Sequence, residues 1–277
     1  MSRHKCRKAI IVMGIFMALL LIGVLLTKTF GAKSETIKEV MKDAVLHDEN
    51  RISLFGIKDV NPALISGFVV TIVLLIAAAL IRIFVIPRFK IVPGRFQLLL
   101  ESIVGLFDGM AKNNSPHKNR FLGGYIFGAG VYIFTGTLFE LFGFQAVTTE
   151  GMSIALPAPL SDINGAIALG CLSYLIILSG GISGNGIKGV GSTLKDFSLP
   201  ISMSFRLFGA LLSGLLVTEL VYYYIQLSFI LPVVVGVLFT LLHALIQAYV
   251  LTMLTALFYG EVSEPSHKKI KSKSRTA

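Results

Sequence analysis

Charge is scarce in this sequence, and cysteine is scarcer. Only 14% of the residues are Asp, Glu, Lys or Arg, whereas 54% are hydrophobic and the mean hydropathy is +0.79. This balance excludes an ordinary soluble globule and indicates a protein that crosses a membrane several times. The two cysteines lie in a basic terminal segment (Cys6) and an apolar one (Cys171), so they indicate neither a disulfide framework nor a metal site.

Six apolar stretches are long enough to cross about 30 Å of hydrocarbon, which takes about 20 helical residues. They are predicted at Ile10–Thr27, Leu64–Ile86, Phe121–Leu141, Ile163–Ile182, Leu199–Ile225 and Phe229–Tyr259. The predicted fold class is therefore an all-α integral membrane protein with about six transmembrane helices. The last two stretches are long, so we expect tilt or partial surface exposure.

Basic residues cluster on one side of this predicted topology. The clusters precede the first span, separate the second from the third and the fourth from the fifth, and end the chain. The positive-inside rule then places both termini in the cytoplasm. The same distribution, and not a nucleic-acid partner, accounts for the net charge of +10. The first span also fits a signal peptide, whose cleavage would leave five spans and an external N-terminus.

This topology divides the chain into five segments. We expect a basic cytoplasmic N-terminus at 1–9, the first span or signal peptide at 10–27, an external loop at 28–61, a membrane domain at 62–261 and a basic cytoplasmic tail at 262–277. Between the second and third spans, apolar and polar residues alternate from Phe96 to Asp108. This pattern predicts a short amphipathic helix on the cytoplasmic interface.

Arg206 is the only charged residue between Phe197 and Thr218. An arginine in hydrocarbon costs at least about 2.5–3.5 kcal/mol, so it is expected to have a partner. No carboxylate lies within one helical turn, which indicates a partner on another helix or another protein. The residues around it are small, and small residues let a second backbone approach closely.

The last span carries Thr240, His243 and Gln247 at spacings of three and four, which puts them on one helix face. Glu219 lies in the span before it. Each polar group could be satisfied individually, and Thr240 by its own backbone. Taken together with Arg206, however, the intramembrane ionisable residues indicate a functional site.

Two polar segments of the last two spans have distinctive sequences: Ser204–Gly209 reads SFRLFG, and Ile246–Thr255 reads IQAYVLTMLT. They resemble the S-x-R-L-F-G signature and the Q-A-Y-V-F-T-x-L-T segment of the last helix in subunit a of bacterial F-type ATP synthases, the ATPase A chain family. Weaker matches follow in the expected order: Pro93-Gly94-x-x-Gln97 with Glu101, Leu141-Phe142-Gly143, and Ser161-Asp162-Ile163-Asn164. The resemblance covers about residues 62 to 261.

The sequence departs from the family pattern at four polar positions. Where many relatives have asparagine, four residues after the arginine, this chain has Ala210. Thr240 stands where an acidic residue or histidine is common, and Leu215 where bacterial relatives often have glutamate. The corner asparagine is Glu140. His243 and Glu219 lie one turn, about 5.4 Å, from the usual polar positions and on the same face.

The resemblance implies that this chain alone is not an enzyme but a non-catalytic subunit of a larger complex. It implies an ion-translocating stator subunit in a bacterial plasma or inner membrane, where Arg206 faces the carboxylates of a rotating ring of c subunits between two half-channels. Gln247 would hold the arginine, and the path would include His243, Glu219, Thr240, Asp162, Asn164 and Glu140. The implied partners are the c ring, the peripheral-stalk b subunits, membrane lipid and, indirectly, the soluble ATPase sector. No cofactor or metal is implied.

The coupling ion and the class of protein leave alternatives open. His243 and Glu219 can exchange protons, which favours a proton over sodium, but the ion-selective ligands of the family lie mainly on the ring. A self-contained cation channel or secondary transporter could use the same polar residues. The lack of an internal repeat and of an intrachain partner near Arg206 argues against it. A purely structural scaffold leaves the arginine unexplained.

Overall fold

The computed structural model describes residues 38, 42, 52–54, 57–116, 120–147, 153–223 and 231–264. The predicted first span at Ile10–Thr27 and the tail beyond residue 264 lie outside these residues. Within them, five helices are long and apolar enough to cross a membrane. The protein is thus mostly helical and multi-pass, as the composition predicts.

The elements follow one another with two short hairpins among the helices. The helices are α3 (Pro62–Leu80), α4 (Arg95–Asn114), α5 (Arg120–Leu141), α6 (Ile163–Asn185), α7 (Ile187–Lys195), α8 (Ser198–Tyr223) and α9 (Leu231–Ser263). A π-helical turn, η1 (Ile81–Val85), and a 3₁₀ turn, η2 (Ile86–Arg88), extend α3. Strand β1 (Ile52–Leu54) pairs antiparallel with β2 (Ile57–Val60), and β3 (Gln145–Val147) with β4 (Ser153–Ala155).

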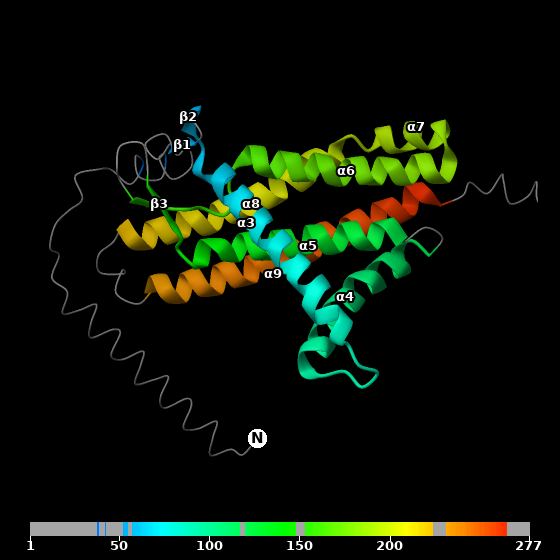
Figure 1. Cartoon of the computed structure of the whole chain (residues 1–277). Helices are drawn as coiled ribbons and strands as arrows, with labels where there is room; N and C mark the ends of the chain where they lie inside the picture. Colours follow the sequence, from blue (N-terminus) through cyan, green and yellow to red (C-terminus); the bar gives the residue numbers. More distant parts are fainter. Residues whose placement is uncertain are drawn as a thin grey trace, which may run out of the picture.

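Four helices, α5, α6, α8 and α9, run side by side, and α3 crosses them obliquely on the side of α5 (Figure 1). The hairpins lie at one end of this bundle, whereas α4 and α7 lie at the other (Figure 1). The core is formed by apolar residues from all four helices, including Ile126, Ile177, Leu207 and Leu251. In contrast, α3 leaves many of its large apolar side chains exposed, as a helix in contact with lipid does.

Glycines bring α6 close to its neighbours. A Cβ atom added at Gly180 would lie 2.7 Å from the ring of Tyr259 on α9, and one at Gly184 would overlap the backbone of Ser263. Without a hydrophobic driving force between helices in lipid, such close approach supplies the packing energy. The small residues of α6 therefore hold α9 at the centre of the bundle.

The helix boundaries differ from the predicted ones mainly at the ends. Helix α4, where the sequence predicts an interfacial helix, has 20 residues and extends past Asp108 to Asn114, and its last turn packs against Gly260 of α9. The apolar pattern did not predict α7, which begins after Gly186, a residue with φ of 63°. The last two spanning helices are long, with 26 and 33 residues. At 1.5 Å per residue, α9 measures about 50 Å, more than the hydrocarbon thickness.

Candidate ion-translocation site

Arg206 lies on a face of α8 that no other described helix covers. It is exposed together with Ser202, Gly209 and Ser213, whereas Met203 and Leu207 on the other side are almost fully buried. The ion pair found in the described ranges joins Lys112 to Asp108, and no carboxylate there neutralises the Arg206 guanidinium. The arginine is thus presented outward, beside small residues that leave room for another backbone.

Ser204 accounts for this orientation of α8. Its side chain is 5% exposed, and its hydroxyl donates to the carbonyl oxygen of Pro200 at 2.7 Å. A Cβ atom at Gly170 of α6 would overlap this hydroxyl, so the two helices touch here. Because residues two apart point to nearly opposite sides of a helix, burying Ser204 against α6 turns Arg206 outward. The serine of the signature segment therefore positions its arginine.

A small cavity of about 10 Å³ lies between α5, α8 and α9. Its polar lining comes from Glu140 and Thr137 on α5 and from Thr240 and His243 on α9. The α8 wall consists of Ala210, Leu211, Gly214 and Leu215. A cavity of this size suits about one water molecule. The structure thus brings Glu140 together with Thr240 and His243, which follow it by about a hundred positions in the sequence.

His243 is held in one orientation by its own helix. Its Nδ1 atom donates to the carbonyl oxygen of Phe239 at 2.8 Å, and the two rings stack with centroids 5.8 Å apart. In the neutral ring, Nε2 is then the atom that accepts a hydrogen bond or a proton. A half-buried imidazole beside a carboxyl group and a hydroxyl group can pass protons along the cavity.

Gln247 lies one turn further along α9 and is 6% exposed. Its Oε1 atom is buried and accepts no hydrogen bond from the described residues. No hydrogen bond joins Gln247 to Arg206 in that part of the chain, so the expected contact between them stays a prediction. Buried polar groups are normally paired, and an unpaired acceptor marks a place where another donor is needed.

Asp162 and Asn164 lie apart from the cavity, at the start of α6. The Oδ1 atom of Asp162 accepts a hydrogen bond of 3.2 Å from the side-chain amide of Asn61, which itself caps α3. Asn164 is exposed. The bond between Asn61 and Asp162 joins the amino ends of two spanning helices, and the role of Asp162 and Asn164 in an ion path stays a prediction. Glu219 belongs to α8, but its side chain lies outside the described residues.

Two participants in the site were not predicted from the sequence. Thr137 lies one turn before Glu140 and lines the same cavity, so the spacing of three could have indicated it. Gly170 gave no signal, because its importance comes from contact with a helix distant in sequence. In the described ranges, no cluster of three or more His, Cys, Asp or Glu side chains could hold a metal ion.

Comparison with known proteins identifies the family. The profile of the family described as "ATP synthase A chain" matches residues 66–260. ATP synthase subunit a of Cereibacter sphaeroides strain ATCC 17025 is 26% identical over 192 residues, which are 65% of this chain and 74% of the relative, and the protein of strain ATCC 17029 gives the same values. The chloroplastic ATP synthase subunit a of Bigelowiella natans is 36% identical over 124 residues, which cover 40% of this chain and 49% of the relative. The chain described here therefore belongs to the ATP synthase A chain family.

Proposed function

We propose that this chain is the ion-translocating stator subunit of an F-type ATP synthase, with Arg206 facing the carboxylates of a c ring. Family membership makes it a non-catalytic part of the membrane sector. The observation that carries the finer proposal is the exposed face of α8, where Arg206 lies among small residues and forms no ion pair with the described carboxylates. Exposing that charge to lipid is costly, whereas a carboxylate on a ring helix would neutralise it.

The guanidinium stays protonated throughout the cycle. It therefore favours the ionised form of a ring carboxylate that arrives beside it and promotes release of that site's proton into an exit channel. Because it repels cations, it also blocks a direct leak between the two half-channels. A ring site that moves on into lipid must be neutral, since an unpaired carboxylate in hydrocarbon is costly.

The cavity between α5, α8 and α9 belongs to the outer half-channel in this proposal. Glu140, Thr240 and His243 provide its proton-exchanging and hydrogen-bonding groups, with Glu219 one or two turns along α8. Ala210 and Gly214 are small enough to leave space there. Asp162 and Asn164 would lie near its mouth, at the hairpin end of the bundle. Gln247 would accept a hydrogen bond from Arg206 when the ring is present.

The proposed surroundings are a bacterial plasma or inner membrane with both termini in the cytoplasm. The hairpin end would face outward, and the end with α4, α7 and the last turn of α9 would face the cytoplasm. The b subunits of a peripheral stalk would attach to this chain, and the soluble ATPase sector would act through them and the ring. The proposed coupling ion is the proton, because His243 and Glu140 line one cavity.

The decisive experiment replaces Arg206 and measures ATP-driven pumping in membrane vesicles. We expect Arg206→Ala to abolish pumping, and Arg206→Lys to impair it because lysine lacks the planar fork and loses its proton more readily when desolvated. Arg82→Ala is the matched control, since Arg82 is also an exposed arginine of a spanning segment. Coupled pumping by Arg206→Ala at the control rate would contradict the proposal.

Purification and ion dependence test the alternatives. The stator assignment requires the chain to co-migrate with a multi-copy small hydrophobic subunit and a soluble ATPase. Ion flux by the chain alone in vesicles would instead identify a self-contained channel or transporter. Glu140→Gln and Glu219→Gln should each slow proton flux without loss of assembly. Strong stimulation of ATP hydrolysis by millimolar sodium, with sodium uptake that survives a protonophore, would refute the assignment of the proton as the coupling ion.

A further inference from the structure

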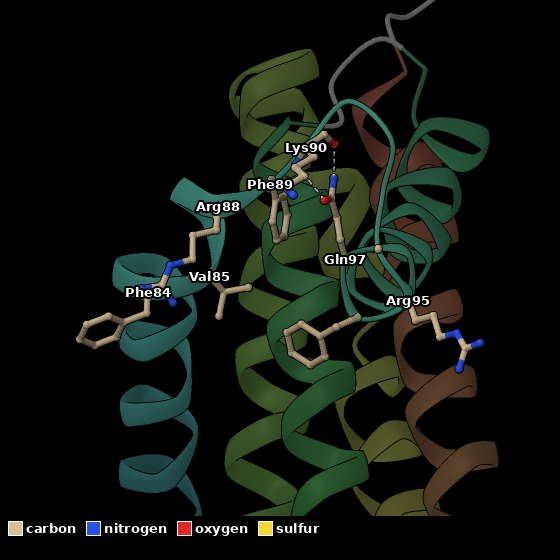
Figure 2. Close-up of a pocket in the computed structure, with 9 residues that line it drawn as sticks. Phe84, Val85, Arg88, Phe89, Lys90, Arg95 and Gln97 are labelled. Carbon is tan, nitrogen blue, oxygen red and sulfur yellow. Dashed lines mark hydrogen bonds between the residues drawn. The ribbon is translucent and has the colours of Figure 1, made fainter.

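We propose that the junction between α3 and α4 binds the phosphate headgroup of an anionic phospholipid. A cavity of about 400 Å³ lies there, between the turns that end α3 and the first turn of α4. Phe84, Val85 and Phe89 give it apolar walls, and Arg88, Lys90 and Arg95 supply the cations. Figure 2 shows Arg88 and Arg95 on opposite sides of the cavity, with their guanidinium groups turned outward and away from each other, and Lys90 above them.

The loop that forms the cavity is fastened by one glutamine. The side-chain amide of Gln97 donates to the carbonyl oxygen of Lys90 at 2.9 Å, and its Oε1 accepts from the Lys90 amide at 3.0 Å (Figure 2). The same amide group also donates to the carboxylate of Glu101 at 2.7 Å. These bonds explain the P-G-x-x-Q-x-x-x-E segment structurally, because they fold residues 90–97 back onto α4 and keep the cavity open.

The three cations are available to an outside anion. In the described ranges, Arg88, Lys90 and Arg95 are exposed and make no ion pair, and the one nearby carboxylate, Glu101, is engaged by Gln97. The cap residue of α4 is Gly94, which has no side chain to satisfy the first amide groups, and the first turn contains no acidic residue. Those amides add to the attraction for a phosphate.

The position along α3 favours a lipid over a dissolved phosphate. The span from Pro62 to Arg88 has 27 residues, which at 1.5 Å each is about 40 Å. The hydrocarbon is about 30 Å thick, and about 40–45 Å with the headgroups included, so Arg88 lies at headgroup depth. Phe84 and Phe96 line the cavity and are exposed, as acyl-chain contacts would be.

The test uses the absence of tryptophan from this chain, which makes an introduced tryptophan the only one. The full-length Phe89→Trp variant is placed in phosphatidylcholine vesicles that contain a fifth of brominated phosphatidylglycerol or, separately, brominated phosphatidylcholine. We expect stronger quenching by the anionic lipid. Phe68→Trp, exposed on α3 with no charged residue within eight positions of it in the sequence, is the control and should show little preference. Phe96→Trp repeats the test if Phe89→Trp does not fold.

The cations are tested in the same vesicles. A basic residue near the membrane surface contributes about fivefold to anionic-lipid binding, so Arg88→Gln with Arg95→Gln should reduce the preference about 25-fold. Lys188→Gln with Lys195→Gln, exposed on α7, should leave it unchanged. Gln97→Ala should weaken it by loosening the loop.

Four results would overturn the proposal. One is an equal preference for the anionic lipid at positions 89 and 68, and a second is a preference that survives the double arginine change. Another is displacement of the lipid by 10 mM inorganic phosphate, which would indicate a site for free anions. The last is protection of the Phe89→Trp variant from both brominated lipids in the assembled complex, which would show that a protein subunit covers the cavity.

Discussion

Gln247→Leu should make the folded chain more stable while impairing ion transport. The Oε1 atom of Gln247 is buried and accepts no hydrogen bond from the described residues. A buried acceptor without a partner costs about 1–3 kcal/mol in water-soluble proteins. Leucine has a similar size and no polar atom, so the substitution removes this cost without opening a large cavity.

The expected gain lies toward the lower end of that range. Hydrogen bonds between membrane helices average about 0.6 kcal/mol, because polar groups also find partners in the unfolded state within the membrane. We therefore expect Gln247→Leu to raise the free energy of unfolding by about 1 kcal/mol. The loss of transport would follow separately, because leucine cannot accept a hydrogen bond from Arg206.

The measurement is the helical circular dichroism of the purified chain as sodium dodecyl sulfate is added, together with proton pumping by the assembled complex. Thr255→Val is the matched control on the same helix. Thr255 is fully buried, but its hydroxyl donates to the Leu251 carbonyl oxygen at 2.8 Å. Its replacement removes a satisfied bond, so this variant should be neutral or less stable by up to about 1 kcal/mol.

The sign of the change in the free energy of unfolding shows whether Gln247 Oε1 lacks a hydrogen-bond partner. A loss of more than about 1 kcal/mol in Gln247→Leu, on the scale of a net hydrogen bond, would mean that Oε1 has a partner in the isolated chain. Unchanged pumping would separately exclude Gln247 from the path.

Three further outcomes test the orientation and the packing of the site. A cysteine at Ser213, on the exposed face of α8, should form a disulfide with a cysteine near the ring carboxylate, and one at the buried Leu211 should not; the reverse pattern would overturn the orientation. Gly170→Val should destabilise the chain by about 1–3 kcal/mol, because the added side chain would overlap α8. Gly128→Val should be tolerated, because there is open space around its Cβ position. Equal effects of the two changes would contradict the close contact between α6 and α8 at Gly170. His243→Ala should slow proton flux in assembled vesicles, and wild-type flux would place the path elsewhere.

The spanning helices could be predicted because hydrocarbon imposes one requirement along their whole length. The predicted span at Phe121–Leu141 differs from α5 by one residue, since charges or glycine bound it. Helix α7 was missed because its nine residues contain Gly189 and Gly191 and too few apolar residues for a span. It forms through tertiary contact: Gly189 packs against Gly181 of α6.

The sequence indicates several candidate site residues, but it does not predict which of them lie together in the fold. Arg206 was identified because an intramembrane charge is conspicuous in any apolar segment. The cavity was not, because Glu140 and His243 come from helices that meet only in the folded bundle. Nor could sequence spacing separate Asp162 from that group: its partner, Asn61, precedes it by 101 positions.

That bond between Asn61 and Asp162 also bears on how the protein is made. Ribosomes add about 5–20 residues per second, so the amino end of α3 waits about 5–20 s before its partner is synthesised. Helix α9, which completes the core beside α5 and α6, arrives later still. During that interval the earlier helices are stable individually in the bilayer but not yet joined. Helix α8 and its Arg206 are therefore synthesised before α9 can complete the bundle around them.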